Sequence, residues 1–375
     1  MFNKIQHIND VLPFISEKKE IRVQQQADGL TVVCYEAYDE QTFDTAAALE
    51  CRGIVFDRTG ALVSRPLHKF FNLGEFPAYS LEKLMARDDI ACIFEKIDGS
   101  MVATAWVDDK LLWRSMKSFS SPVVSYTETF LAKSENQRLQ QFAQLAASQG
   151  MTAVFELQHP DLPIVIPPDK VDLRLLHVRD NLSGEYLMLN PQHPVHDWIA
   201  EYAIPLAPRF DAWTLRMALD ALPEMADSEG FVIQFQNGDM LKVKCPWYLR
   251  RHGASSVLRE RDVAILALEQ KLDDVKAALA QAGVDLTEVL ATEARLHQQL
   301  RLLEQEVAAL AAQGAGLDRK GFALKFRPHP LFSLAMAHFT GQKPQLTPWY
   351  GANRLKQDFG MRVVAEFPET ASPDN

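Results

Sequence analysis

Residues 228–244 read Ser-Glu-Gly-Phe-Val-Ile-Gln-Phe-Gln-Asn-Gly-Asp-Met-Leu-Lys-Val-Lys, two alternating runs around a central Asn-Gly pair. Asn-Gly between such runs is the strongest short-range signal for a β-hairpin, here with a two-residue type I′ turn at Asn237-Gly238. A two-residue loop pairs Gln236 with Asp239 and so sets the register of both strands. Because side chains alternate along a strand, we expect one face to carry Glu229, Phe231, Ile233, Lys242 and Lys244.

This predicted face mixes one acid and two lysines with apolar side chains, an unusual composition for a protein core. A nucleotide would match it, with apolar groups for the base, lysines for the phosphates and a carboxylate for the sugar or a metal ion. An exposed amphipathic hairpin with a cross-strand ion pair explains the same pattern equally well. The hairpin by itself therefore leaves a nucleotide site and a solvated surface as alternatives.

A second segment that carries chemistry, Lys96-Ile97-Asp98-Gly99, directly follows the apolar run 90–94, which is typical of a strand. At ordinary residue frequencies, a chain of this length contains a Lys-x-Asp-Gly match by chance in roughly one case in fifteen. A lysine at a strand end before an Asx-Gly turn is the alternative without chemistry. The acid and the two lysines of the downstream hairpin favour a chemical role for this segment.

Lys96-x-Asp-Gly99, Glu229-Gly230 and Lys242-x-Lys244 resemble motifs I, IV and V of the covalent nucleotidyltransferases, the superfamily of RNA ligases, DNA ligases and mRNA capping enzymes. The resemblance extends to the phage tRNA-repair RNA ligases, the RNA ligase 1 class, and covers about residues 30–252. Five further segments carry it: Glu50-Cys-Arg52-Gly-Ile-Val-Phe56, His68-Lys69-Phe-Phe-Asn-Leu-Gly-Glu75, Phe155-Glu156-Leu157, Val178-Arg-Asp-Asn181 with Gly184-Glu185, and Trp247-Tyr248.

The chain departs from this family pattern in two places. Motif III of the family usually has a lysine before a Gly-Ser turn, whereas this chain reads Arg114-Ser-Met-Lys117-Ser, so either Lys117 or Arg114 could fill that role. The C-terminal region does not match the helical tRNA-binding domain of the family. RNA specificity is therefore the part of the function that the resemblance supports least.

The resemblance implies an ATP-dependent RNA ligase that joins a 5′-phosphate to a 3′-hydroxyl in three steps. The amine of Lys96 would attack the α-phosphorus of ATP, the AMP would pass to the RNA 5′-phosphate, and the 3′-hydroxyl would then expel it. An ordinary lysine, with a pKa of ~10.4, is protonated near pH 7 and cannot attack. We therefore expect neighbouring cations, here Lys242, Lys244 and a bound Mg²⁺, to favour the neutral amine.

The resemblance also assigns a role to each candidate site residue. ATP is the implied cofactor, and Mg²⁺ is the implied metal, with Mn²⁺ as a substitute. Asp98 is expected either to orient the nucleophile or, as we favour, to cap its turn. The remaining roles are Arg52 on the ribose or the attacked phosphate, Lys69 on the triphosphate, Glu156 on the ribose hydroxyls, Glu229 on a metal ion or its water, Lys242 and Lys244 on the α-phosphate, Lys117 or Arg114 in motif III, and Gly99 for close approach of the backbone to the nucleotide.

Two other classes of protein share parts of this pattern. A capping guanylyltransferase or a DNA ligase would share motifs I, IV and V, but the segments around Arg52 and Lys69 argue against both. A non-catalytic nucleotide or RNA sensor could retain the same core for binding only. His193-Pro-Val-His196 has the spacing of metal ligands, but its prolines favour a surface turn.

The charge balance and the type of hydrophobic pattern both change near residue 250. Residues 1–250 hold 24 Lys and Arg against 34 Asp and Glu, and residues 251–375 hold 15 of each, which together give the net charge of −10. The first region shows short β-rich runs, and the second becomes helical. We predict an α+β adenylyltransferase domain over 1–250, with ATP-grasp-like antiparallel sheets and flanking helices, followed by a mainly α-helical C-terminal domain over 251–375.

Residues 257–312 carry a heptad pattern in two halves, interrupted at Gly283. The pattern predicts two helices of ~25 residues, each ~37 Å long, that form a long antiparallel hairpin. Six basic and ten acidic side chains make this arm acidic. A packed pair or spacer is the simpler interpretation, and an arm that contacts a protein partner is the alternative.

Residues 319–362 reverse the sign, with eight basic residues against the single acid Asp358, and interleave aromatic rings. Basic groups neutralise phosphates and exposed rings stack on bases, so we expect RNA, with tRNA one candidate, to bind here and at the active-site face. The alternative for each ring is a place in the core. Residues 369–375 read as a frayed tail.

Composition excludes several classes of protein. The chain is 47% apolar and 23% charged, which is typical of a globular protein and not of a disordered one. No apolar stretch approaches the ~18 residues of a membrane span, and the N-terminus lacks the pattern of a signal peptide. The four cysteines read as reduced thiols, so we expect a cytoplasmic protein without membrane contact.

Overall fold

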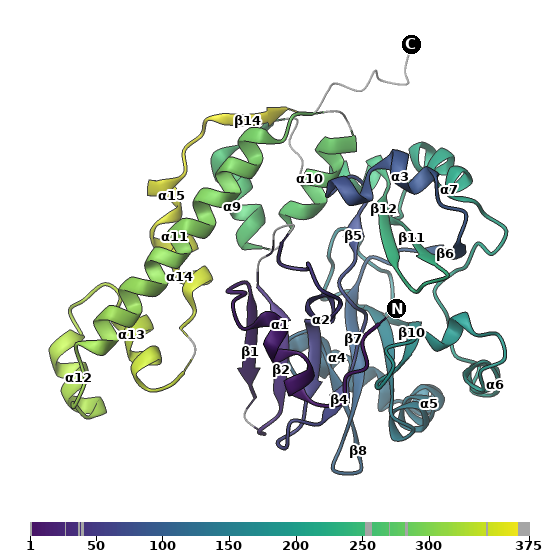
Figure 1. The fold of residues 1–375 in the computed structure, drawn as a ribbon, viewed down its shortest axis with the longest axis horizontal. Coiled ribbons are helices and arrows are strands. Elements are labelled where there is room, and N and C mark those ends of the chain that lie inside the picture. The colour runs from purple at the N-terminus through teal and green to yellow at the C-terminus, as the bar shows by residue number, and fades with distance from the viewer. Residues whose placement is uncertain are drawn as a thin grey trace. The chain divides into compact units, whose positions relative to one another are not determined.

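The computed structural model describes residues 2–26, 28–36, 38, 41–251, 257–269, 271–281, 284–342 and 344–366. The chain forms two compact units, Met1–His252 and Gly253–Asn375, and each is treated by itself (Figure 1). Gly283, Lys343 and the predicted tail 369–375 lie outside the described residues. Within those described ranges, no helix is both long enough and apolar enough to cross a membrane.

The first unit is built on three four-stranded sheets, and all but one of their strand pairs are antiparallel. The first sheet has the order β1 (Ile21–Gln25), β2 (Thr31–Tyr35), β3 (Arg52–Phe56) and β4 (Leu62–Ser64). The second has the order β10 (Asp172–Asp180), β9 (Met151–Gln158), β7 (Ser100–Val107) and β8 (Lys110–Arg114). The third has the order β5 (Phe71–Asn72), β12 (Met240–Lys244), β11 (Gly230–Phe235) and β6 (Ile90–Glu95).

Helices flank these sheets, which confirms the predicted α+β class. The amphipathic pair α4 and α5 packs on the second sheet, where Phe142 contacts Phe155 in a fully buried cluster. The helices of this unit are α1 (Leu12–Ile15), α2 (Ala46–Leu49), α3 (Leu81–Met85), α4 (Pro122–Leu131), α5 (Gln137–Ser148), α6 (Val195–Glu201), α7 (Leu215–Ala221) and α8 (Pro246–Arg251).

The second and third sheets pack face to face through an apolar layer. Phe94 of β6 and Val232 of β11 meet Val154 of β9 in this layer, together with Phe70 from the segment before β5. Lys96 directly follows Phe94 and Glu95 of β6, so its position is set by the end of a strand whose inner face is buried in this layer. Lys96 therefore lies at the edge of a packed core.

The hairpin of β11 and β12 forms, but its predicted register is wrong by one residue. Val232, not Ile233, pairs with Lys242, and Gly230 pairs with Lys244. Phe231 and Ile233 belong to the core on the opposite face of the sheet. The cause is the turn: Gly238 has a φ of +90° while Asn237 does not have a positive φ, and Phe235 donates to Asp239 across a three-residue loop.

The second unit is mainly helical, as predicted, with one small antiparallel sheet of β13 (Val257–Arg259) and β14 (Val363–Glu366). Its longest element is α11, and α12 and α13 lie at one end of it (Figure 1). The helices are α9 (Glu260–Leu268), α10 (Leu272–Gln281), α11 (Thr287–Ala312), α12 (Arg319–Phe326), α13 (Phe332–Phe339), α14 (Leu346–Asn353) and α15 (Leu355–Asp358).

The predicted long helical hairpin over 257–312 is only half right. Its second half is the single 26-residue helix α11, whose heptad leucines at 296 and 303 are buried. Its first half starts as the strand β13, because pairing with β14 buries Leu258 beside Val364. It then breaks between α9 and α10, where the Lys271 N–H donates to the Leu266 carbonyl and ends α9.

The aromatic rings of the basic segment 319–362 mostly form the core of this unit. Four rings are buried against α11, at Phe322, Phe326, Tyr350 and Phe359. The rings of Phe322 and Phe339 stack on each other with centroids 4.2 Å apart. For these rings the core interpretation is correct, and base stacking by them is excluded in this arrangement.

Candidate active site

The three predicted motifs meet at one carboxylate. Glu229 Oε2 lies 2.7 Å from Lys96 Nζ, and Glu229 Oε1 lies 2.7 Å from Lys244 Nζ. Backbone pairing sets this geometry, since the Lys96 N–H donates to the Gly230 carbonyl at 2.9 Å. Gly230 has a φ of +136°, and a Cβ there would lie 2.1 Å from the Val243 carbonyl oxygen. Only glycine therefore lets β11 place Glu229 between the two lysines.

The charge of this cluster is set by burial and by the two ammonium groups. Burial by itself raises the pKa of the Glu229 carboxyl, but Lys244 and Lys96 outweigh it and the pKa is lowered. The side chain of Lys96 is 21% exposed, whereas that of Lys244 is 5% exposed. Lys96 is thus the member of the cluster that an incoming molecule can reach.

Glu156 brings a second carboxyl to the same region from β9. Burial raises its pKa to about 8, and the Lys96 cation only partly offsets this effect. Near neutral pH this side chain is therefore mainly a protonated carboxyl, able to donate as well as accept a hydrogen bond. Such a carboxyl can exchange hydrogen bonds with ribose hydroxyls, as the predicted contact requires.

Gly99 brings the loop of Lys96 against β9. A Cβ at Gly99 would lie 2.6 Å from the carbonyl oxygen of Leu157 and 3.0 Å from Cγ of Glu156. Gly99 was predicted to let the backbone approach the nucleotide, and in the structure it lets the Lys96 loop approach β9. Any larger residue would push the Lys96 loop away from Glu156.

Arg52 and Lys242 flank the ring of Phe70. The Arg52 guanidinium lies 5.3 Å from the ring centroid, and the Lys242 ammonium lies 5.2 Å from it. Arg52 also reaches Sδ of Met101, at 3.8 Å from Nη1. Phe70 was not among the predicted site residues, although it lies in the segment 68–75 that carries part of the resemblance.

Lys69 lies in a cage of aromatic rings. Its ammonium is 3.6 Å from the ring centroid of Tyr38, and the rings of Tyr35, Phe43 and Phe71 lie within 6 Å. The residue is 2% exposed. Contact with a triphosphate would require this side chain to leave the cage.

The two candidates for motif III occupy different environments. Arg114 is fully buried and donates from Nη2 to the Met116 carbonyl at 2.7 Å, which closes its own loop. Lys117 is half-buried, and burial lowers its pKa. Arg114 is thus engaged in holding the turn, and Lys117 is the less buried of the two cations.

The Asp98 carboxylate binds segments far from its own turn in the sequence. One carboxylate oxygen accepts from the N–H groups of Val165 and Ile166, at 2.9 and 2.6 Å. The other accepts from the hydroxyl of Tyr248 at 2.6 Å, and this ring lies against the Lys244 ammonium. Asp98 therefore ties the Lys96 segment to the segment that follows Lys244.

Sequence reasoning missed a buried ion triad that joins segments next to two of the predicted site residues, Arg52 and Lys69. Glu50 binds Arg65 and Arg179, each at 2.8 Å, and all three side chains are at most 1% exposed. Burial alone would raise the pKa of the Glu50 carboxyl, but the two guanidinium groups outweigh this effect and lower the pKa to about 2. The triad joins the residues before Arg52 to the segment before Lys69 and to β10. No local signal pairs residues 129 positions apart.

A metal ion would find few protein ligands here. Among residues the structure describes, no group of three or more His, Cys, Asp or Glu side chains could hold one. The ionised carboxylate of Glu229 suits a hard cation such as Mg²⁺, which often takes one or two carboxylates and completes its shell with phosphate and water. His196 lies in the first turn of α6, where its Nε2 contacts the Asn190 carbonyl at 3.0 Å, so the predicted surface turn holds for His193 and is wrong for His196.

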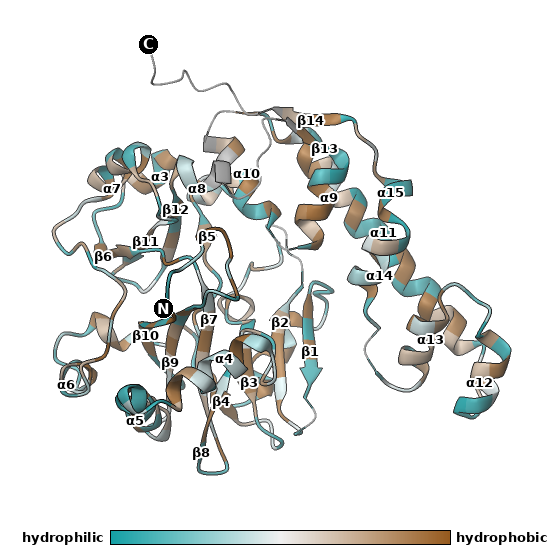
Figure 2. Cartoon of the chain, turned by 180° about the vertical axis from the view of Figure 1, so that it is seen from behind, coloured by the Kyte–Doolittle hydropathy of each residue, from teal (hydrophilic) through white to brown (hydrophobic). Residues whose placement is uncertain are grey.

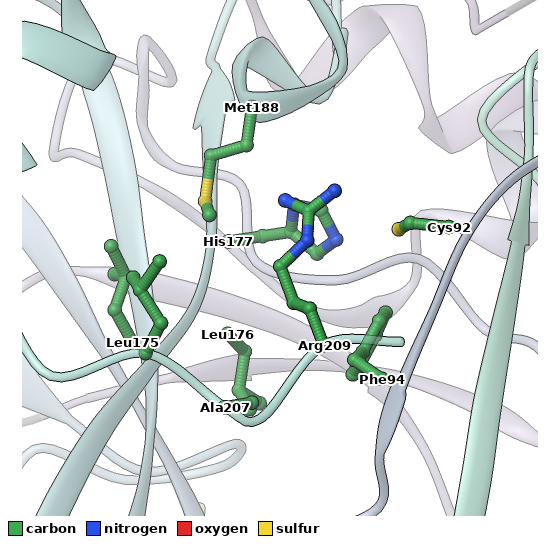
Figure 3. A pocket seen from close by; sticks show the side chains of 9 residues that line it. Cys92, Phe94, Leu175, Leu176, His177, Met188, Ala207 and Arg209 are labelled. Carbon is green, nitrogen blue, oxygen red and sulfur yellow. The ribbon is translucent and has the colours of Figure 1, made fainter. Parts of the chain in front are cut away.

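A separate pocket lies deeper between the second and third sheets (Figure 3). His177 and Arg209 reach it among apolar side chains that include Phe94. Burial, with the Arg209 and Arg179 cations, lowers the pKa of His177 to about 3, so the imidazole is neutral. None of the predicted site residues lines this pocket.

Comparison with known proteins gives a consistent result. A family model described as RNA ligase matches residues 50–248. A putative RNA ligase of Thermovibrio ammonificans is 32% identical over 286 residues, which cover 74% of this chain and 73% of that protein. RNA ligase 1 of bacteriophage TS2126 is 29% identical over 330 residues, which cover 84% of this chain and 78% of that protein.

Solved structures give weaker matches. An archaeal ATP-dependent RNA ligase matches with a TM-score of 0.43 and 14% identity, covering 84% of this chain and 85% of its own. A putative ATP-dependent DNA ligase from Aquifex aeolicus matches with a TM-score of 0.46 and 14% identity, covering 80% of this chain and 81% of its own. The sequence matches carry the assignment: this chain belongs to the phage-type RNA ligase family.

Proposed function

We propose that the protein is an ATP-dependent RNA ligase that joins a 5′-phosphate to a 3′-hydroxyl through a lysyl-AMP intermediate on Lys96. The observation that carries the proposal is the carboxylate of Glu229, shared between Lys96 and Lys244 in a chain of the RNA ligase family. This carboxylate joins the partly exposed amine of Lys96 to the buried ammonium of Lys244. That arrangement suits attack on a phosphate next to a positive charge.

In the first proposed step the lone pair of the Lys96 nitrogen forms a bond to the α-phosphorus of ATP. The bond from that phosphorus to the bridging oxygen breaks, and pyrophosphate leaves with the electron pair. For this attack the ion pair with Glu229 must open, and the nitrogen must hold a free electron pair, its extra proton having passed to water. Opening of this ion pair is therefore required before the attack.

Other residues of the site would hold the nucleotide. Lys242 and Lys244 suit the α-phosphate, Arg52 the ribose or the attacked phosphate, and Glu156 the ribose hydroxyls. We propose Lys117 for the motif III role, since Arg114 is engaged in its turn. Lys69 is proposed as a triphosphate ligand only after its side chain leaves the ring cage.

Glu229 is the proposed ligand of Mg²⁺ or Mn²⁺, directly or through water. When bound, such an ion would supply positive charge to the phosphates and to the carboxylate that Lys96 leaves. This position agrees with the lowered pKa of Glu229, which keeps the carboxyl ionised near neutral pH.

The later proposed steps transfer AMP from Lys96 to the RNA 5′-phosphate and then expel it by attack of the 3′-hydroxyl. RNA repair is the proposed setting, with tRNA the first substrate to test. The four cysteines are free and buried, and we expect the protein to act in the cytoplasm, where thiols stay reduced.

Mass measurement after incubation with ATP and Mg²⁺ tests the proposal directly. A gain of one AMP is expected for the wild type and no gain for Lys96→Ala. No gain in the wild type would refute catalysis and favour a nucleotide or RNA sensor. An adduct that forms with α-labelled GTP but not with α-labelled ATP would favour a capping-type guanylyltransferase instead.

A further inference from the structure

The basic segment 319–362 contains two kinds of cation. Arg354 pairs with Glu306 of α11 at 2.7 Å. Arg362 pairs with Glu288 at 2.6 Å and with Glu260 at 2.8 Å. These two arginines neutralise acids of the predicted arm, so they hold the second unit together and are not available to an external anion.

The cations of α12 and its C-terminal end have a different environment. Arg319, Lys320, Lys325 and Arg327 are all exposed, and in the described part of the chain none of them lies within 4 Å of a carboxylate oxygen. The nearest acid in sequence, Asp318, accepts from the Gly321 N–H at 2.7 Å and caps the helix. Four positive charges thus gather on about two turns of helix, and Figure 2 shows a hydrophilic stretch at this end of the unit.

Packing fixes which side of α12 faces the rest of the second unit. Phe322 and Phe326 are buried on the inner side of α12, with their ring centroids 4.7 Å apart. A Cβ at Gly314 would lie 2.3 Å from the Phe322 ring, which shows how closely the end of α11 approaches α12. The outward side also carries Leu324, which is 76% exposed. A largely exposed leucine between cations suits a partner that offers both negative charge and flat apolar faces.

We propose that α12 and Arg327 form the surface by which the second unit binds the phosphate backbone of single-stranded RNA. Arg319, Lys320, Lys325 and Arg327 would neutralise successive phosphates, and Leu324 would lie against a sugar or a base. The proposal rests on the proposed RNA ligase function and narrows the RNA contact from 44 residues to one helix. An acidic protein partner is the competing occupant, and RNA is favoured because the chain belongs to the RNA ligase family.

The proposal makes a quantitative prediction about salt. Each phosphate contact with single-stranded RNA adds about 0.7 to the slope of log affinity against log salt. Loss of four contacts should therefore reduce the slope by up to about 3. A charge change that does not touch the RNA should leave the slope almost unchanged.

Two variants with equal net charge distinguish direct contact of these side chains with RNA from a general attraction between the protein and RNA. The test variant combines Arg319→Gln, Lys320→Gln, Lys325→Gln and Arg327→Gln. The control variant combines four exposed lysines of the first unit: Lys4→Gln, Lys19→Gln, Lys110→Gln and Lys133→Gln. Affinity for a 5′-phosphorylated single-stranded RNA oligonucleotide is measured from low to high NaCl for both variants and the wild type.

The expected result is a loss of affinity of at least tenfold at low salt and a shallower slope for the test variant, with less than a twofold loss for the control. Equal losses in both variants would mean that only net charge matters, and an unchanged test variant would favour a protein partner. Either outcome overturns the proposal. The gain of one AMP is measured in parallel, so failure of the catalytic function is read separately from RNA binding. Circular dichroism confirms that each variant is folded.

Discussion

Two carboxylates of the first unit each lie between two cations, yet their surroundings differ. Glu50 holds two arginines in a triad that is almost wholly shielded from water. Glu229 holds two lysines, and one of them, Lys96, is partly exposed. Arginine stays protonated in proteins and matches carboxylate geometry with its planar fork, whereas lysine can lose its proton and act as a nucleophile. The same local charge pattern thus suits a fixed scaffold at Glu50 and a reactive centre at Glu229.

Lys96→Arg should produce the largest effect, because it keeps a cation beside Glu229 but removes the proposed nucleophile. We expect no AMP adduct by mass, since a guanidinium does not deprotonate near neutral pH. The midpoint of chemical denaturation should stay close to that of the wild type. An adduct on the variant would mean that another residue is the nucleophile.

Glu50→Gln should produce the largest loss of stability. Removing one partner of a buried ion group costs about 3–5 kcal/mol, because the remaining charges stay buried without compensation. Glu229→Gln is the matched variant and should cost less, since Lys96 can turn toward water. Denaturant unfolding of both variants measures the difference. Equal losses would contradict the distinction between scaffold and reactive centre.

Sequence could predict which residues meet at Glu229, because each lies in a short local motif on a strand or at its end. The structure brings Lys96, Glu229 and Lys244 together through backbone pairing that adjacent residues encode. The register of the hairpin could not be predicted in the same way. One extra loop residue at Gln236 moves Phe231 and Ile233 to the opposite face of the sheet.

Long-range pairing explains the other differences. The contacts of Glu50 with Arg65 and Arg179 depend on three segments meeting in the fold, and no period or motif links them. The break in the predicted arm has a similar origin. Pairing of Leu258 with Ala365, 107 positions away, replaces the first helical turn with a strand.

The pH dependence of stability should reveal Glu156 as a third kind of carboxyl, half-buried and mainly neutral. Its pKa is raised from 4.5 to about 8, so the folded state binds its proton more tightly than the unfolded state. Stability should therefore fall as the pH rises from about 4.5 to about 8, by at most about 5 kcal/mol and by less where solvent screens this half-buried side chain. Glu156→Gln should remove this fall. The free energy of unfolding at pH 5 and pH 8 is the measurement, and parallel losses in both proteins would contradict it.

Arg354→Gln should have the smallest effect, because its pair with Glu306 lies in the second unit with side chains 30% and 47% exposed. Water and salt screen such a pair, so the expected loss is about 1 kcal/mol or less. A cycle with Glu306→Gln isolates the pair energy, and 1 M NaCl should reduce it further. A value near that of Glu50→Gln would show that partner type, and not burial, sets the strength of these pairs. A small value would leave burial as the property that distinguishes the scaffold of the first unit from the ion pairs of the second.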